Sequence, residues 1–120
     1  MSATDIILQG ACVALGGALG GGVRYAMSTR PHGLLAANTA ACGLLGIVVA
    51  LGLGNQLTLL LGVGIAGSLS TWSSLAAHLG AHYKRSITNG ISHTLIAVAC
   101  GLTAFMAGHT VTDWMVSALG

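Results

Sequence analysis

The sequence predicts an all-α membrane protein of four transmembrane helices, in which the third helix is broken at mid-membrane. Two totals predict the membrane class: 54% of the 120 residues are hydrophobic and only 5% are charged, whereas charged residues make up about 25% of a soluble domain. At about 20 residues for each spanning helix, this length suits four spans in a single domain, residues 1–120. A stretch rich in glycine and hydroxyl side chains, residues 62–75, lies inside the third apolar region and predicts the break.

The first expected span, residues 6–28, is apolar and studded with glycines. Gly16 lies four residues before Gly20, and Gly17 four residues before Gly21. This spacing of small residues lets the backbone of a second helix approach closely. These glycines are therefore interpreted as helix-packing positions.

The second expected span, residues 34–53, follows a short turn at Pro31, which cannot continue the first helix. Its distinctive residue is Asn38, because an amide deep in an apolar helix needs a hydrogen-bond partner. Two interpretations stay open for this side chain. It bonds a neighbouring helix, or it offers its NH2 group to a passing anion.

The third expected span, residues 57–83, has a polar centre that runs from Gly67 to Ser74. In hydrocarbon every backbone amide needs a partner, so an irregular, polar stretch at this depth must be buried in protein or line a wet cavity. The hypothesis is a broken helix whose hydroxyls and freed carbonyls face an ion path. Carbonyls freed near Gly67 suit a monovalent cation.

The fourth expected span, residues 91–108, is interrupted by small or polar residues, among them His93 and Thr94. A short tail, residues 109–120, follows it and carries Asp113 and Trp114. With four spans, the first and third connections lie on one side of the membrane and both termini on the other.

The cationic side chains indicate an orientation. All four Lys and Arg residues lie at the first and third connections, namely Arg24, Arg30, Lys84 and Arg85. The positive-inside rule then places these connections in the cytoplasm and the termini outside, in a multi-pass protein of the plasma membrane. Arg24 either extends to the headgroups or belongs to a site. So few cations exclude a nucleic-acid surface.

The acidic residues limit the chemistry. Asp5 and Asp113 are the only carboxylates, and both lie near the chain ends. No embedded acid is present to drive proton-coupled export or to complete a hydrolytic triad, so the chain is not expected to be an enzyme. His78 and His82 form the one helical histidine pair, and metal binding there is the weaker interpretation. What remains is a path lined by neutral donors with Arg24 near one end, a pattern that suits a small anion.

Three motifs in order resemble the CrcB/Fluc family of fluoride channels. The segment GGALGGGVRY, residues 16–25, is similar to the first-helix pattern GGxxGxxxRY. ANTAACG, residues 37–43, resembles the family's second-helix pattern around its asparagine. GVGIAGSLSTWSSL, residues 62–75, resembles the broken third helix, GxGxxGGxTTFSTF. The resemblance covers nearly the whole chain.

The resemblance implies an antiparallel, dual-topology dimer of four-helix subunits that passively exports fluoride. It implies a central structural Na+ held by the backbone carbonyls of Gly67 and Ser70 from each subunit. It also implies an anion pathway through the following residues: Arg24, Asn38, Thr71, Trp72, Ser73, Ser74 and His93.

The chain departs from the family pattern at several of these positions. Trp72 and Leu75 stand where the family has two pore phenylalanines, and Leu75 has no aromatic edge to offer an anion. Ser68 replaces a glycine, and Ala97 replaces a polar residue of the fourth helix. His93 replaces a residue that is usually Asn or Tyr. The expectation is an intact Na+ site beside a degraded anion path.

The one-sided charges suggest how such a chain would function. A homodimer that inserts both ways needs almost no Lys/Arg bias, whereas here the bias is complete. The hypothesis is that this chain pairs with an oppositely oriented paralogue, rather than only with a second copy of itself. Two rival functions remain: a structural membrane protein that assembles through its glycines, and a small-molecule or cation transporter.

Overall fold

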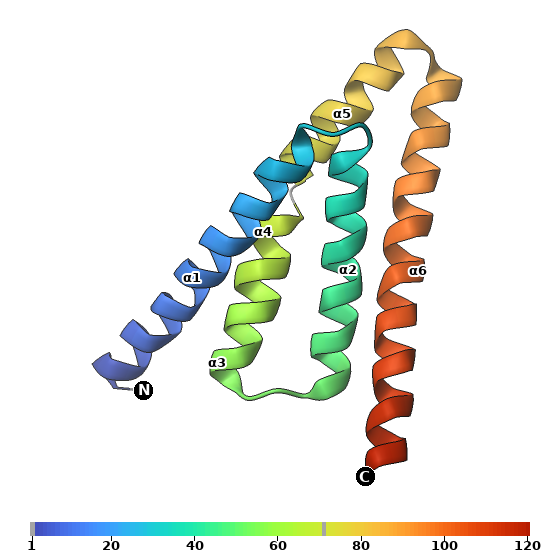
Figure 1. Ribbon diagram of the computed structural model, residues 1–120. Helices are drawn as coiled ribbons and strands as arrows, with labels where there is room; N and C mark the ends of the chain where they lie inside the picture. Colours follow the sequence, from blue (N-terminus) through green and yellow to red (C-terminus); the bar gives the residue numbers. More distant parts are fainter. Residues whose placement is uncertain (1, 71) are drawn as a thin grey trace.

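The computed structural model describes residues 2–70 and 72–120, with side chains described outside residues 72–75. Within this part of the chain every regular element is a helix (Figure 1). The elements, in chain order, are α1 (Ala3–Ser28), α2 (Gly33–Leu51), α3 (Asn55–Leu57), the π-helix η1 (Thr58–Ala66), α4 (Gly67–Leu69), α5 (Trp72–Arg85) and α6 (Ile87–Leu119).

Three of these helices are long and apolar enough to cross a membrane. They are α1, α2 and α6, whose most apolar windows have mean hydropathies of 1.7, 2.1 and 1.6. The run from Asn55 to Leu69 is also apolar but shorter. The helical membrane class expected from composition is therefore confirmed.

The connection between α1 and α2 is a tight turn that requires a glycine. The Gly33 amide donates to the Arg30 carbonyl at 3.0 Å, and His32 before it adopts a left-handed backbone with φ of 59°. A side chain at Gly33 would collide with the carbonyl oxygen of Met27. Local backbone geometry, rather than burial of side chains, therefore reverses the chain here.

Helix α1 crosses η1 and α4 through direct backbone contact. A Cβ atom added to Gly16 would lie 2.7 Å from the Gly64 Cα, and one added to Gly64 would lie 2.7 Å from the Gly16 Cα. One turn along, a side chain at Gly20 would strike the Ser68 hydroxyl. Gly10 and Gly17 have no such neighbour within 4 Å. One of the two expected glycine pairs of α1 therefore forms this contact, whereas Gly17 of the other pair lies on an open face.

The helical run that begins at Asn55 changes its hydrogen bonding before it ends. In η1 the bonds reach back five residues, and the amide of Gly67 accordingly contacts the carbonyl of Gly62. The run ends at Leu69, because Ser70 has an extended backbone with φ of −88° and ψ of 133°. The Ser70 amide still donates to the Ala66 carbonyl at 3.1 Å. Helix α5 begins at Trp72.

Helix α6 begins earlier and ends later than the expected span. Its first amides are capped by Ser86, whose hydroxyl oxygen accepts from the Asn89 amide at 3.0 Å. The helix continues through residues 109–119, which the sequence suggested as a tail. It packs along α2, where added side chains at Gly46 and Gly108 would meet backbone atoms of the opposite helix.

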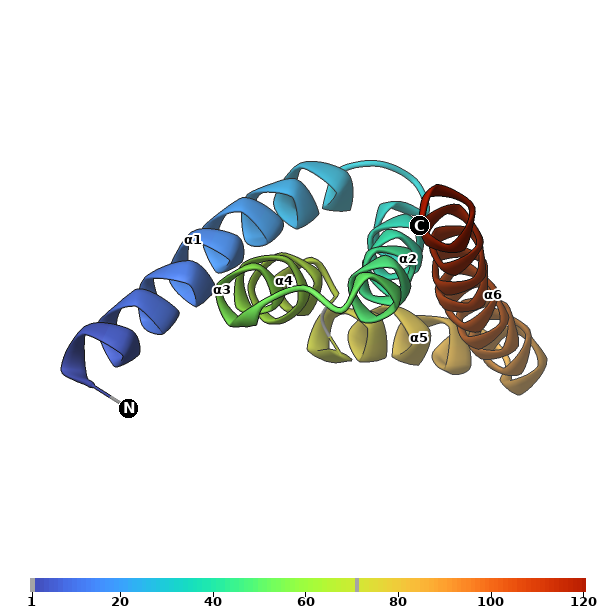
Figure 2. The same ribbon diagram turned by 90° about the horizontal axis from the view of Figure 1, so that it is seen from below.

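Seen from one end, the helices form a curved layer rather than a closed bundle (Figure 2). The Cα extents of 51 × 36 × 23 Å reflect this thin shape. The α1–α2 and α5–α6 connections lie at one end of the layer, whereas both termini and the α2–α3 connection lie at the other (Figure 1). The cationic connections therefore share one end.

The interior of the layer is small. Its buried apolar residues are Ala37, Ala41, Val48, Ala66 and Leu69, and no larger side chain is fully buried among those described. Large apolar side chains are instead exposed along every long helix, such as Leu19 at 58% and Leu102 at 62%. A surface of this kind is stable only against lipid or another apolar protein face.

The α1–η1 contact leads to a stability prediction. We expect Gly16→Ala to destabilise the fold by about 1–3 kcal/mol, because the added methyl meets backbone that cannot move aside. The matched control is Gly10→Ala on the open face of α1, where the higher helix propensity of alanine makes the change neutral or stabilising. The measurement is the thermal unfolding midpoint of each variant in detergent. Equal midpoints would show that the contact does not hold these helices together.

Candidate functional site

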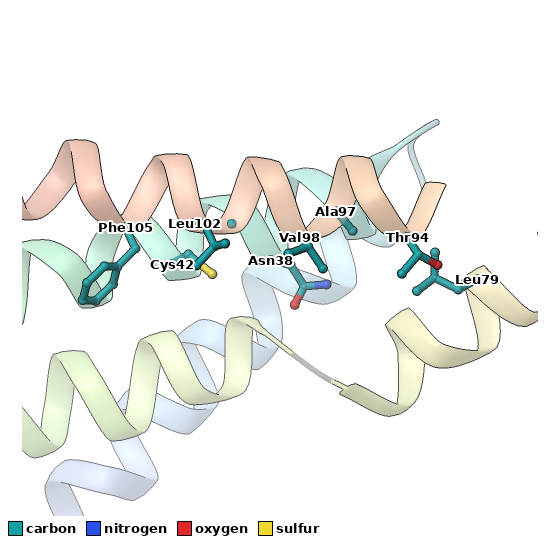
Figure 3. A pocket seen from close by; sticks show the side chains of 9 residues that line it. Asn38, Cys42, Leu79, Thr94, Ala97, Val98, Leu102 and Phe105 are labelled. Carbon is teal, nitrogen blue, oxygen red and sulfur yellow. The ribbon is translucent and has the colours of Figure 1, made fainter. Parts of the chain in front are cut away.

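A groove of about 400 Å³ lies next to Asn38, one of the expected site residues. We call it the Asn38 groove. It lies between α2, α5 and α6 (Figure 3). Its lining residues are Asn38 and Cys42 from α2, Leu79 from α5, and Thr94, Ala97, Val98, Gly101, Leu102 and Phe105 from α6.

The periodicity of α6 explains why one helix supplies most of this lining. Thr94, Ala97, Gly101 and Phe105 are spaced by three or four residues, which places them on one helix face. Gly101 lets α2 come close, because a Cβ there would lie 3.2 Å from the Cys42 sulfur. The groove is therefore a consequence of small residues at the α2–α6 contact.

Polar groups are few in the groove, and Asn38 is the main one. Its Nδ2 donates to the Leu34 carbonyl at 3.1 Å. One N–H is sufficient for that bond and the amide has two, and the hydrogen bonds seen among the described residues do not use the second. The Thr94 hydroxyl donates to the Gly90 carbonyl at 2.8 Å, and its oxygen lies 3.2 Å from the Tyr83 hydroxyl. Among the described residues that line the groove, none is acidic.

The contacts of Asn38 leave both interpretations from the sequence, a bond to a neighbouring helix and donation to an anion, as predictions. Its amide bonds a carbonyl of its own helix rather than a neighbouring helix, and it also faces the groove (Figure 3). Thr39 makes the equivalent bond to the Leu35 carbonyl at 2.8 Å. It lines a separate groove on the other side of α2, together with Cys100 and Thr103.

Arg24 lies apart from the Asn38 groove. It borders a separate pocket of about 180 Å³ with Tyr25, Ser28 and Leu34. Leu34 connects the two places, since its carbonyl holds the Asn38 amide. Arg24 thus shares a pocket with Leu34, which lies one helical turn before Asn38 on α2, but Arg24 and Asn38 line different cavities.

Gly67 and Ser70 border one pocket of about 120 Å³ between α2 and the η1–α4 run. Cys42 lines this pocket as well as the Asn38 groove. The carbonyls of the last helical turn lack regular intrahelical partners where a helix ends, and the extended Ser70 ends α4 here. Backbone oxygens beside open space are the donor set that a bare alkali cation needs, so these residues fit such an ion.

His93 is half-buried on α6, beyond the end of the Asn38 groove. Its Nδ1 lies 2.9 Å from the Asn89 carbonyl oxygen. Thr71 lies outside the described residues. Trp72, Ser73 and Ser74 belong to α5 by their backbone, and their side chains are likewise outside the described part.

Sequence reasoning missed most residues of the groove, among them Cys42 and Phe105. Phe105 is the single phenylalanine of the chain, and its ring lies at one end of the groove (Figure 3). The spacing of residues in α6 could have indicated Phe105, because this residue lies on the same helix face as Thr94, Ala97 and Gly101. Cys42 lies one helical turn after Asn38 and so shares its face.

Comparison with known proteins identifies the relatives of this chain. A family model described as CrcB-like protein, Camphor Resistance (CrcB), matches residues 11–109. The chain belongs to the CrcB family. The CrcB match covers most of α1 and α6 and all of the elements between them, and therefore every described residue that lines the Asn38 groove.

Individual CrcB relatives agree with the family match. A fluoride-specific ion channel, FluC 2, of Rhodococcus jostii is 33% identical over 109 residues, which cover 84% of this chain and 96% of that protein. FluC of Paracoccus denitrificans is 34% identical over 111 residues, with 82% and 90% covered. FluC 2 of Mycobacterium tuberculosis is 30% identical over 88 residues, with 71% and 68% covered.

These relatives are ion channels rather than enzymes. Together with the apolar helices, the relationship makes this CrcB-family chain a multi-pass membrane protein.

Proposed function

We propose that the chain is a subunit of a fluoride-specific channel that lets fluoride leave the cytoplasm passively. The observation that carries this proposal is the Asn38 groove in a chain related to fluoride-specific ion channels. The groove offers an amide donor and no carboxylate. A small anion loses its hydration in a pore only where donors replace the water, and an acid at that point would repel it.

The same composition argues against the rival functions. A coupled transporter of protons or metal cations needs an embedded charged partner for its cargo, and no charged side chain is found among the described residues that line the groove. A purely structural protein needs no hollow of about 400 Å³ with the amide of Asn38 in its wall. The glycine contact between α1 and η1 then supports the fold of the channel and is not itself the function of the protein.

Four membrane crossings follow if the run from Asn55 to Arg85 acts as one interrupted span. Asn55–Leu69 alone measures roughly 22 Å, which is short of the hydrocarbon thickness of about 30 Å. Helix α5 supplies the remaining length beyond Ser70. Irregular backbone between the two pieces is tolerated at that depth if protein or a water-filled path surrounds it.

A second subunit completes the pore. The single chain is a thin, open layer with exposed apolar faces, so the Asn38 groove needs another wall. The cations lie at one end of the layer, away from both carboxylates and both termini (Figure 1). Such one-sided charge favours a single orientation, so the opposite subunit of an antiparallel dimer is an oppositely oriented paralogue.

A structural Na+ at the dimer centre is the third part of the proposal. Gly67 and Ser70 would hold it with backbone carbonyl oxygens, since both border the same pocket. The ion supplies a fixed positive charge that joins the two subunits and attracts an anion nearby. Ser68 in place of a glycine leaves these carbonyls in place, because its hydroxyl is directed at the Gly64 carbonyl, 2.7 Å away.

The channel proposal predicts fluoride sensitivity. A strain of the source organism that lacks the gene should stop growing at lower fluoride concentrations, and the wild-type gene should restore growth. Asn38→Ala should slow fluoride efflux from loaded cells at least about tenfold, because a hydrogen bond to a charged group contributes about 1.5–3 kcal/mol. Thr39→Ala, which removes the equivalent back-bond outside the groove, is the control. Unchanged fluoride tolerance in the deletion strain would disprove the channel.

The partner proposal predicts a fixed orientation. A tag at either terminus should be reached only from outside the cell, and the chain expressed alone should give little fluoride efflux. Efflux should appear when the oppositely oriented paralogue is co-expressed. Strong efflux from the chain alone, with tags found on both sides, would instead establish a dual-topology homodimer.

The Na+ proposal predicts a cation-dependent stability. Thermal unfolding of the purified assembly should shift upward by several degrees when Na+ replaces N-methylglucamine, since a ligand at about 100 times its Kd adds about 2.7 kcal/mol. K+ at the same ionic strength separates specific binding from screening. Identical midpoints in all three salts would remove the ion from the proposal.

A further inference from the structure

Four of the five histidines of the chain converge at one end of the molecule. His32, His78 and His93 line a cavity of about 20 Å³, and each comes from a different segment: the α1–α2 connection, α5 and α6. We call this the histidine cavity. Its volume is about that needed by one water molecule, and therefore also suits a small monatomic ion.

The fourth histidine, His82, positions the others. Its ring stacks on that of His93, with centroids 3.6 Å apart and an angle of 13° between the ring planes. The ring of His78 meets it edge-on, with centroids 4.8 Å apart. Residues separated by up to 15 positions in the chain thus form one aromatic contact that ties α5 to α6.

A hydrogen bond determines which ring nitrogen of His93 carries the hydrogen in the neutral form. Its Nδ1 lies 2.9 Å from the Asn89 carbonyl, and a carbonyl oxygen only accepts, so Nδ1 carries the hydrogen. In the neutral ring Nε2 then holds a lone pair, which repels an anion. On protonation Nε2 becomes a charged N–H donor. The proton therefore changes this atom from one that rejects an anion to one that binds it.

The histidine cavity adjoins the Asn38 groove. Leu79 and Ala97 line both of them, so the histidines lie at the mouth of the groove. Thr94, the polar residue at that end of the groove, follows His93 directly in sequence. An ion leaving the histidine cavity would enter the groove next to Thr94 and then reach Asn38 (Figure 3).

The charged groups around the mouth are all basic. The α1–α2 connection contributes Arg30 beside His32, and the end of α5 contributes Lys84 and Arg85 beside His82. Helix α6 contributes His93, and Tyr83 of α5 is engaged with Thr94. Both carboxylates belong to the segments near the termini, at the other end of the layer (Figure 1). No acid at this end neutralises a protonated imidazole.

We propose that His32, His78 and His93 form a proton-dependent binding site for a small monovalent anion at the mouth of the groove. This inference rests on the proposed fluoride channel and names the place where the anion first binds. Imidazole is the side chain that gains its proton between about pH 8 and 5. Acidification thus charges the mouth, raises the local anion concentration and increases fluoride conduction. A metal site is disfavoured, because no three His, Cys, Asp or Glu among the described residues are arranged to hold a metal ion.

The test is the fluoride current through the assembled channel, purified from its own membrane with any second subunit that accompanies it. Current in a planar bilayer reports the anion alone, because undissociated HF carries no charge. With equal pH on both sides, lowering the pH from about 7.5 to 5.5 should raise the current about fivefold, as expected for about 1 kcal/mol of attraction. His32→Asn/His78→Gln/His93→Gln should make the current nearly independent of pH.

Two variants keep the test decisive. His109→Gln changes the one histidine outside the cluster and should leave the fivefold rise unchanged. His32→Asn alone changes an exposed turn residue, and asparagine tolerates the positive φ found there. This variant folds even if the triple one does not, and it should show a reduced rise.

Each remaining outcome contradicts a separate claim. A wild-type current that does not respond to pH, or a triple variant that keeps the full response, would overturn the histidine site. A response that chelators abolish and Zn2+ restores would replace it with a metal site. Absence of any fluoride current in the wild type would instead count against the channel itself.

Discussion

The structure depends on how closely its helix backbones approach one another. At the α1–η1 crossing, Gly16 and Gly64 bring main-chain atoms into contact, and the buried apolar set consists mainly of alanines with one valine and one leucine. In a bilayer, lipid tails are as apolar as leucine side chains, so helices associate through close packing rather than through exclusion of water. A fold built this way buries few large side chains. Its free energy of unfolding therefore depends strongly on single methyl groups added at the crossing.

Close packing also explains why the groove exists. Gly101 opposite Cys42 brings α2 and α6 together, whereas the longer side chains of Leu79 and Phe105 hold the space open at its ends. The polar side chains of Asn38 and Thr39 are satisfied within α2, because both donate hydrogen bonds to carbonyls one turn earlier. The amide in the groove is therefore held in place by its own helix and does not need a neighbouring subunit for its orientation.

Composition and periodicity were sufficient to predict the helical membrane class, and the motif around Asn38 indicated a residue that does line a groove. Other features depend on contacts that a sequence does not display. The convergence of His32, His78 and His93 requires knowing that the chain reverses between α5 and α6 at Ser86 alone, whereas the expected spans left residues 84–90 between them. Phe105 was overlooked because a lone aromatic in an apolar helix resembles ordinary packing. The extent of α6 was underestimated, since Asp113 marked a tail by polarity although a single acid does not end a helix.

The length of α6 has a consequence for the membrane. Its 33 residues extend roughly 50 Å, against a hydrocarbon layer of about 30 Å. Tilt alone would have to exceed about 50° to hide this length, beyond the range of about 0–40° found for such helices. Several turns of α6 must therefore stand clear of the acyl chains. If these are the last turns, Trp114 and Asp113 fall at headgroup level. Their interactions with the headgroups would then fix the position of the whole subunit along the bilayer normal.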